Sequence, residues 1–155
     1  MFKIGDRVVY KGKVCSIVSK NEDSYTLIPI EDNSLKITVK IENASFRNLL
    51  SKEEVMAIIK QMPSIEVLDI PDKMLEQEYK RLMTTGNHID LIKIIKTTYL
   101  INKNRLYNNK KIGDRDNNYF LQAENLLYTE FKEVLDMSYD EVKEYVIKSI
   151  ENLNN

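Results

Sequence analysis

The sequence of 155 residues contains one cysteine, one histidine and no tryptophan. A lone cysteine excludes an internal disulfide, so a cytoplasmic location is the expectation. Cysteine and histidine are common ligands of structural zinc, and one of each gives no zinc-binding spacing. Only four glycines occur, and they are scattered, which excludes a glycine-rich loop for phosphate groups. We therefore expect no metal and no other cofactor.

Long apolar segments are missing as well. No stretch approaches the ~20 apolar residues that span a bilayer, and residues 1–6 lack the apolar core of a signal peptide. We therefore expect no contact with a membrane. Hydrophobic residues make up 43% of the chain and charged residues 30%, which indicates a folded globular protein rather than a disordered one.

Charge of one sign is not concentrated in either half of the chain. The sequence holds 23 basic and 24 acidic residues, and its net charge is −1. Residues 1–50 hold 8 of the basic and 6 of the acidic residues. Neither half has the strong positive charge of an autonomous DNA-binding domain. Binding to nucleic acid would therefore be weak or assisted by another protein.

The first 48 residues consist of short apolar runs separated by turn residues. β-Branched and aromatic residues alternate with polar ones, which is typical of antiparallel hairpins. Pro29 has no N–H group, so it belongs at an edge or a bulge. We predict a small curled antiparallel β-barrel of the SH3 or Tudor type within an α+β protein. Its strands are predicted at residues 7–10, 14–18, 25–30 and 35–41, with a short fifth strand around 45–47.

The character of the sequence changes at Ser51. Ser51 and Glu54 form a capping box, and Pro63 ends the helix that they begin. A second helix should open at Pro71 and end near Gly86, because glycine suits a left-handed C-cap. This change predicts two domains, a β-module at residues 1–48 and a helical domain at residues 51–155.

Three more helices are predicted after Gly86, giving about five in all. Residues 102–118 should form a polar loop between the third and fourth helices. A second capping box, Ser138 with Glu141, should begin the last helix. Helical spacing of apolar residues gives the expected inward faces. They are Ile89, Ile92, Ile95 and Tyr99 in the third helix; Phe120, Ala123, Leu127, Phe131 and Val134 in the fourth; and Val142, Tyr145 or Val146, and Ser149 or Ile150 in the last.

Candidate catalytic residues are few. His88 lies in the first turn of a predicted helix, which favours a surface or capping role. Cys15 lies in an apolar strand, which favours a buried and unreactive thiol. The acidic pairs at residues 53–54 and 140–141 lie in first helical turns, where they suit capping and the helix dipole better than acid–base chemistry. The sequence therefore predicts a binding protein rather than an enzyme.

One candidate binding surface lies in the β-module. Val39, Lys40 and Ile41 lie on a predicted strand, Lys20 lies on another, and Arg47 follows just beyond. These residues could form a cationic edge, and an exposed edge strand can pair with a strand of a partner. The alternative is that they are ordinary solvated strand residues.

A second candidate surface lies in the helical domain. Basic residues surround Tyr107 between positions 103 and 115, and this pattern can hold a phosphate backbone and support a base. A solvated loop between helices accounts for the same pattern. Lys80 and Arg81 could join this segment in direct binding to duplex DNA. The basic residues of the segment are Lys103, Arg105, Lys110, Lys111 and Arg115.

The opening decapeptide at residues 1–10 is similar to the start of the CarD/CdnL family of bacterial transcription regulators. These proteins begin with a phenylalanine, a lysine and an apolar residue, followed by Gly-Asp and a Val-Val-Tyr strand. Residues 39–44 resemble the family where a basic strand residue shortly precedes Glu-Asn-Ala. Residues 50–55, which enter the first helix, provide a third similarity. The resemblance covers essentially the whole chain.

This resemblance implies a Tudor-like β-module that binds the β subunit of bacterial RNA polymerase, partly by strand addition. It also implies a helical domain that touches promoter DNA at the upstream edge of the melted bubble and stabilises the open complex. By position, Lys40 matches a basic residue that contacts polymerase, and Lys20 matches another. We expect a monomer that has the polymerase β subunit and promoter DNA as partners.

The chain also departs from the family pattern. The sequence Lys11-Gly12-Lys13 replaces the family's Pro-His-His-Gly turn, and the family's proline after the basic strand is missing. The tryptophan that many members wedge into the minor groove is absent, and the matching stretch, residues 70–77, has Lys73 as its one basic residue. Two alternatives stay open. One is an adaptor without DNA contact, and the other is a weak duplex-DNA binder that uses the basic segment 103–115.

Overall fold

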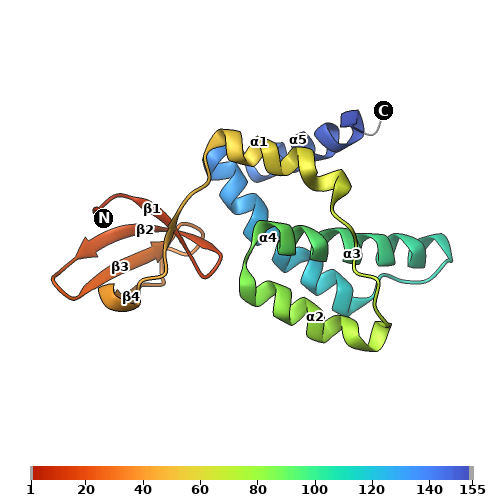
Figure 1. Ribbon diagram of the computed structural model, residues 1–155, viewed down its shortest axis with the longest axis horizontal. Coiled ribbons are helices and arrows are strands. Elements are labelled where there is room, and N and C mark those ends of the chain that lie inside the picture. Colours follow the sequence, from red (N-terminus) through yellow and green to blue (C-terminus); the bar gives the residue numbers. More distant parts are fainter. Residues whose placement is uncertain (1, 154–155) are drawn as a thin grey trace. The chain divides into compact units, whose positions relative to one another are not determined.

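A computed structural model of the chain describes residues 2–153. The chain divides into two compact units, Met1–Leu50 and Ser51–Asn155. The first is built on an antiparallel sheet and the second on helices, as Figure 1 shows. The prediction of an α+β protein with five helices after a β-module is confirmed for the described residues.

The first unit contains one antiparallel sheet with the strand order β4-β3-β2-β1-β5. Its sheet is open, since β4 and β5 are edge strands and do not pair with each other within residues 2–153. A closed barrel is therefore not present in this sheet. The register shifts between Ile17 and Ser19, at an irregularity of the β2–β3 pair. The strands are β1 Arg7–Tyr10, β2 Lys13–Lys20, β3 Ser24–Pro29, β4 Ile37–Lys40 and β5 Arg47–Asn48.

The fourth strand is shorter than the predicted strand at residues 35–41. Asp32 accepts hydrogen bonds from both the N–H and the hydroxyl of Ser34, which closes a turn before β4. At the other end, the 3-10 helix η1 Ile41–Asn43 turns the chain away. Local turn hydrogen bonds at both ends therefore limit the strand to four residues.

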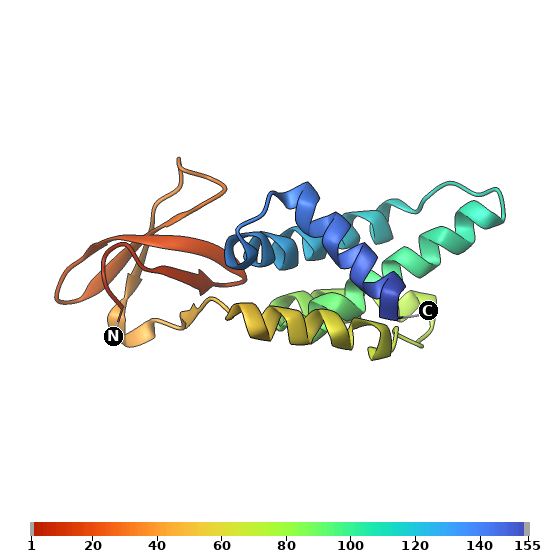
Figure 2. The same cartoon turned by 90° about the horizontal axis from the view of Figure 1, so that it is seen from above.

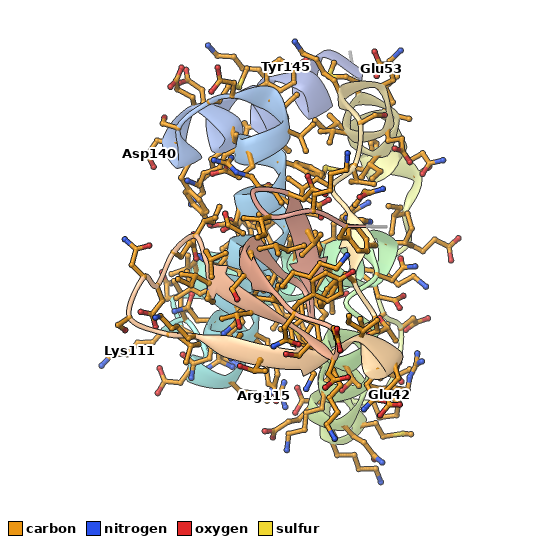
Figure 3. All side chains as sticks on the ribbon, turned by 90° about the vertical axis from the view of Figure 1, so that its left-hand side faces the viewer. Glu42, Glu53, Lys111, Arg115, Asp140 and Tyr145 are labelled. Carbon is orange, nitrogen blue, oxygen red and sulfur yellow. The ribbon has the colours of Figure 1, made fainter. Side chains whose placement is uncertain are left out.

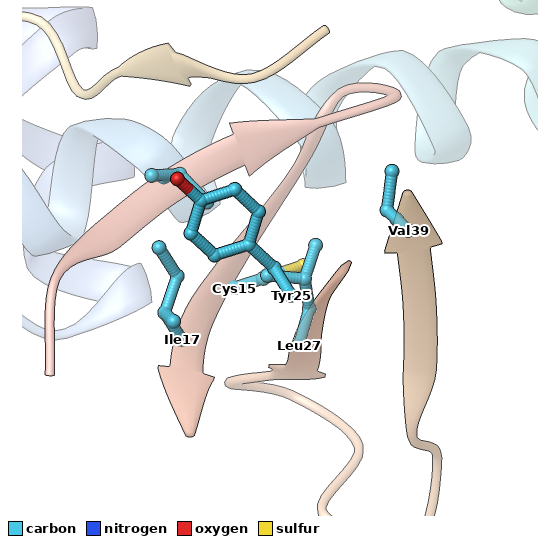
Figure 4. Close-up of a cluster of buried hydrophobic side chains, with 6 residues drawn as sticks. Cys15, Ile17, Tyr25, Leu27 and Val39 are labelled. Atoms are coloured by element: carbon cyan, nitrogen blue, oxygen red, sulfur yellow. The ribbon is translucent and has the colours of Figure 1, made fainter. Parts of the chain in front are cut away.

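The core of the first unit is formed by apolar side chains that alternate with more exposed ones along the strands. Six buried side chains form one cluster, and Figure 4 shows it. Cys15 is fully buried in this cluster, which confirms the predicted buried thiol. The ring of Phe46 packs edge-on against the rings of Phe2, Tyr10 and Tyr25 and extends the cluster. The six residues of the cluster are Val8, Cys15, Ile17, Tyr25, Leu27 and Val39.

The second unit begins with two short helices. Helix α1 Lys52–Gln61 starts at the predicted capping box: Ser51 Oγ accepts from the Glu54 N–H, and Glu54 accepts from the Ser51 N–H. The 3-10 helix η2 Met62–Ser64 follows it directly. Helix α2 Asp72–Thr85 ends at Gly86, whose φ of 62° is the predicted left-handed cap.

The remaining helices are α3 His88–Tyr107, α4 Asp114–Leu135 and α5 Tyr139–Leu153. Helices α3 and α4 form an antiparallel hairpin, which Figure 2 shows, and α5 packs against α4 and α1. The second capping box is present, because Ser138 and Glu141 exchange hydrogen bonds of 3.1 Å each. The packing of α3 against both α2 and α4 organises this unit.

The predicted polar loop at residues 102–118 is wrong. Helix α3 continues to Tyr107 and α4 begins at Asp114, so the loop covers only residues 108–113. Asn102 is buried and accepts a hydrogen bond from the Gly113 N–H, and Arg105 Nε donates to the Lys111 carbonyl. Polar side chains at the end of α3 therefore bind the loop that joins the two helices. A run of polar residues looks the same in the sequence whether it forms such a helix end or a loop.

The predicted inward face agrees with the structure in α4 and at Val142 and Val146 of α5, but it is incomplete for α3. Ala123, Leu127 and Phe131 are buried in α4, while Phe120 and Val134 are half-buried. Val142 and Val146 are buried in α5, and the predicted Ser149 and Ile150 lie outside the described side chains. Helix α3 packs on two sides, so more of its surface is covered, yet its predicted core residue Tyr99 is 58% exposed. Its buried residues are Leu91, Ile92, Ile94, Thr97, Thr98 and Asn102.

Candidate interaction surfaces

The edge strand β4 exposes backbone groups as well as side chains. The Ile41 N–H donates a hydrogen bond of 2.8 Å to the Asp23 carbonyl, and Val39 lies opposite Tyr25. In an antiparallel pair, successive residues direct their backbone groups alternately toward the neighbouring strand and away from it. Thr38 therefore directs its N–H and C=O groups, and Lys40 its N–H group, away from β3, while the Lys40 carbonyl lies at the N-cap of η1. Within residues 2–153, β4 has no other neighbouring strand.

The side chains of β4 alternate in the same way. Thr38 and Lys40 are exposed, while Val39 is 6% exposed and belongs to the buried cluster. The side chain of Val39 therefore packs inside the sheet and does not lie on the exposed surface of β4. Ile41 is 36% exposed in η1, so it borders the surface of Lys40. Apolar and polar residues alternate at positions 37–40, and this pattern could have identified Thr38 as a second exposed residue of the edge strand.

The two other predicted cations of the β-module do not share the β4 edge. Lys20 lies at the end of β2, where its Nζ is 5.4 Å from the ring centre of Tyr25 and 3.5 Å from the Phe2 carbonyl. Arg47 lies on β5, the opposite edge strand in the order of the sheet. Its guanidinium donates to the Asn48 carbonyl at 3.1 Å. Lys40 is therefore the predicted cation that lies on the β4 edge.

The predicted cations of α2 differ in their surroundings. Lys73 is exposed in the first turn. Lys80 Nζ lies 3.9 Å from Glu76, and Arg81 Nε donates to Glu78 at 2.7 Å. Glu76 and Glu78 each partly neutralise the basic residue beside them, which weakens the attraction of that residue for a phosphate group. This helix surface is therefore mixed in charge rather than a continuous basic patch.

The predicted cations of the α3–α4 hairpin fall into two groups. Arg105 is exposed and its Nε donates to the Lys111 carbonyl at 2.7 Å, which holds the guanidinium in place, whereas Arg115 pairs with the carboxylates of Asp72 at 2.9 Å and Asp116 at 3.2 Å. Lys110 and Lys111 are exposed; Figure 3 labels Lys111 and Arg115. Arg115 therefore links α2 to α4, and its hydrogen-bonding groups have partners within the chain.

Exposed aromatic and apolar side chains accompany the free lysines of this hairpin. Tyr107 is 86% exposed and Leu106 is 55% exposed at the end of α3. One turn earlier, Lys103 Nζ lies 6.0 Å from the ring centre of Tyr99. Ile112, in the loop, is 45% exposed. The hairpin end therefore offers cations next to aromatic surface, although the charge is smaller than the sequence suggested.

Candidate catalytic residues are explained by structural contacts. His88 Nε2 lies 3.0 Å from the carboxylate of Glu130, which is buried. Cys15 is buried, and desolvation raises the pKa of its thiol. No cluster of metal-ligating side chains occurs among the residues that the structure describes. Within that same part of the chain, no helix has both the length and the apolarity to cross a bilayer.

Comparison with known proteins finds no family model and no curated protein that matches this chain.

Proposed function

We propose that this protein is a CarD-like transcription regulator that binds the β subunit of bacterial RNA polymerase through its N-terminal β-module. Its helical domain then lies near upstream promoter DNA, and the complex with polymerase changes the stability of the open promoter complex. The observation that carries this proposal is the edge strand β4, which directs the N–H and C=O groups of Thr38 and the N–H group of Lys40 away from the sheet.

Strand addition is supported by the chemistry of this edge. A partner strand gains main-chain hydrogen bonds from the outward N–H and C=O groups, and its side chains give specificity. Lys40 is exposed beside those groups, so it can attract an acidic surface and fix the register of the added strand. Only Lys40 among the predicted basic residues combines this exposure with a place on β4.

The architecture of the first unit supports a Tudor-like module. Side chains of the four strands β1 to β4 of the open antiparallel sheet form one apolar cluster, and the 3-10 helix η1 joins β4 to β5. In a Tudor-like module, curling brings the two ends of such a sheet together. The resemblance of residues 1–10 and 39–44 to the CarD/CdnL family is consistent with this arrangement.

The helical domain supports a weaker contact with DNA. Lys110 and Lys111 are exposed beside Tyr107, so the hairpin end can approach a phosphate backbone with an aromatic ring next to it. Two exposed lysines provide few phosphate contacts. DNA contact is therefore secondary to polymerase binding, which holds the domain near the promoter.

The direct test measures the lifetime of open promoter complexes formed by the cognate polymerase, with and without this protein, together with its affinity for the isolated polymerase β lobe. We expect a changed lifetime and measurable binding. Lys40→Glu should weaken binding by roughly 10-fold or more, because it places like charge against an acidic surface. The absence of any binding to the β lobe contradicts the proposal.

Lys36→Glu is the matched control for this variant. Lys36 is exposed just before β4, so its substitution makes the same change of net charge without altering the residues of the edge strand. We expect Lys36→Glu to lower affinity much less than Lys40→Glu. Equal losses would show that overall charge, rather than the β4 edge, determines binding.

A further inference from the structure

The helical unit contains a cavity that the proposed function does not use. It has a volume of about 520 Å³ and lies between η2, α3, α4 and α5. This volume falls within the ~300–1,000 Å³ typical of small-molecule sites. Its walls are mostly apolar, and Ile92, Phe120 and Val146 are among the residues that form them. An apolar body of a small molecule would be removed from water here.

The charges that line the cavity do not cancel. Lys143 Nζ lies 3.1 Å from the carboxylate of Glu124, so these two groups neutralise each other. Lys96 is the third charged group of the lining. Its Nζ donates to the carbonyls of Met62, Pro63 and Ile65 at 2.7, 3.3 and 2.5 Å, and it forms no ion pair with any side chain that the structure describes.

The environment of Lys96 makes its positive charge available to an anion. Neutral carbonyl groups hold the ammonium in place but do not balance its charge. Burial lowers the pKa of Lys96, because the charged form of the ammonium loses part of its contact with water. A partly desolvated cation attracts an anion more strongly than a cation in bulk water does. The cavity therefore combines an apolar interior with a net charge of one positive unit.

Tyr128 supplies a hydrogen-bond donor in the same cavity. The residue is 6% exposed and lines the cavity, and its hydroxyl has no hydrogen-bond partner among the described residues. No described side chain has a fully buried polar atom without a partner. The Tyr128 hydroxyl oxygen is therefore accessible to a molecule in the cavity. A hydroxyl of this kind can donate to an oxygen of a bound molecule.

We propose that this cavity binds a small apolar monocarboxylate of the fatty-acid type. Its hydrocarbon body lies among the apolar walls, and its carboxylate balances the charge of Lys96 and accepts a hydrogen bond from the Tyr128 hydroxyl. Ligand binding in this cavity is separate from the β4 edge, so each can be tested without the other.

Calorimetric titration of the full chain with decanoate, octanoate and decylammonium tests the class of ligand. Decanoate should bind about 10-fold more tightly than octanoate, because two further methylene groups leave water. Decylammonium has the same hydrocarbon length with the opposite charge, and it should bind at least about 10-fold more weakly than decanoate. Equal affinities for decanoate and decylammonium would overturn the proposal, because charge would then play no part.

Two substitutions test the location. Ile147 lines the cavity and is 50% exposed, so Ile147→Trp can fill the cavity without disturbing the buried core. We expect it to abolish decanoate binding. Leu121→Trp is the matched control, since Leu121 is 52% exposed on α4 and does not line the cavity. Equal effects of the two tryptophans, or no effect of either, would place the ligand elsewhere and overturn the proposal.

Tyr128→Phe tests the polar end of the site. It removes a hydroxyl that has no partner within the described chain, so the unfolding midpoint should stay unchanged. Decanoate affinity should fall by about 10-fold, as expected for a lost hydrogen bond to a charged group. An unchanged affinity in Tyr128→Phe would show that the carboxylate does not reach this hydroxyl and would overturn the assigned geometry.

Discussion

The hydroxyl of Tyr79 donates a hydrogen bond of 2.9 Å to the carboxylate of Asp116, and both side chains are buried. Tyr79 lies on α2 and Asp116 on α4, so this bond joins two helices that are separated in sequence. Arg115 extends the network by pairing with Asp116 and with Asp72 at the start of α2. Burial, followed by the bond to Asp116, raises the pKa of the Tyr79 hydroxyl.

The first prediction concerns this network. Tyr79→Phe leaves the buried Asp116 carboxylate without one of its donors, so the free energy of unfolding should fall by about 1–3 kcal/mol. Urea denaturation measures this change. Tyr119→Phe is the control, because the Tyr119 ring centre lies 5.1 Å from that of Tyr79 but its hydroxyl forms no hydrogen bond within the described chain. Equal losses in both variants would show that the Tyr79–Asp116 bond contributes nothing.

The second prediction concerns the capping box at α1 and its dependence on pH. Hydrogen bonds from Ser51 lower the pKa of Glu54. A carboxylate whose pKa is lowered by folding adds stability above its unfolded pKa of about 4.3, and this stability is lost as the pH falls through the folded pKa. Glu54→Gln should therefore destabilise the protein near neutral pH and reduce the loss of stability below about pH 4.

Glu53→Gln is the matched control for this prediction. Glu53 lies in the same helical turn but outside the capping box. Denaturant unfolding at several pH values should show a smaller change for Glu53→Gln than for Glu54→Gln. A similar pH dependence in the two variants would mean that the general charge of the first turn, and not the capping bond, carries the effect.

The third prediction separates the backbone of β4 from the charge of Lys40. The Lys40 φ of −66° is one that proline adopts readily, and its N–H points away from β3. Lys40→Pro should therefore preserve the fold while removing both the charge and the outward donor. Lys40→Gln removes the charge alone. Lys40→Pro should bind the polymerase β lobe more weakly than Lys40→Gln, by roughly 3- to 10-fold for one lost hydrogen bond.

Thermal unfolding of both Lys40 variants provides the control for the fold. Similar unfolding midpoints show that any difference in binding comes from the interface. If the two variants fold equally well and bind the β lobe with the same affinity, main-chain pairing at Lys40 does not take place.

The fourth prediction concerns the end of the α3–α4 hairpin. Replacing Lys110 and Lys111 with glutamine should lower duplex-DNA affinity and reduce the slope of log affinity against log salt by up to about 1.8, which is ~0.9 for each lost phosphate contact. Lys60→Gln, on the exposed surface of α1, is the control and should leave the slope unchanged. Fluorescence anisotropy across a salt series measures both quantities. An unaltered slope in the double variant would remove this hairpin from the DNA surface.

A loss of DNA binding on substitution of Arg115 would not by itself identify a DNA contact, because Arg115 also stabilises the fold. Because Arg115 joins Asp72 to Asp116, Arg115→Gln should lower the free energy of unfolding before it changes any DNA contact. Its effect on the salt slope should be smaller than that of the lysine pair. This contrast follows from the difference between a cation used within the fold and a cation that faces water.

Features that depend on local chemistry could be predicted from the order of the residues alone. Capping boxes at Ser51 and Ser138, the left-handed end of α2 at Gly86 and the buried thiol of Cys15 were all predicted, because each depends on a few neighbouring residues. The period-two pattern of the strands likewise predicted the sheet. The position of Lys40 on an exposed strand followed from the same alternation.

Which charged and backbone groups remain available to a partner became evident from the folded arrangement of the chain. The sequence could not show that Arg115 meets Asp72, 43 residues earlier in the chain, or that Asn102 and Arg105 bind the turn after α3. It could not show that β4 lies at an edge while β5 forms the opposite one. These features depend on contacts between distant residues, and a local pattern contains no information on which distant partner satisfies a charge or a backbone group.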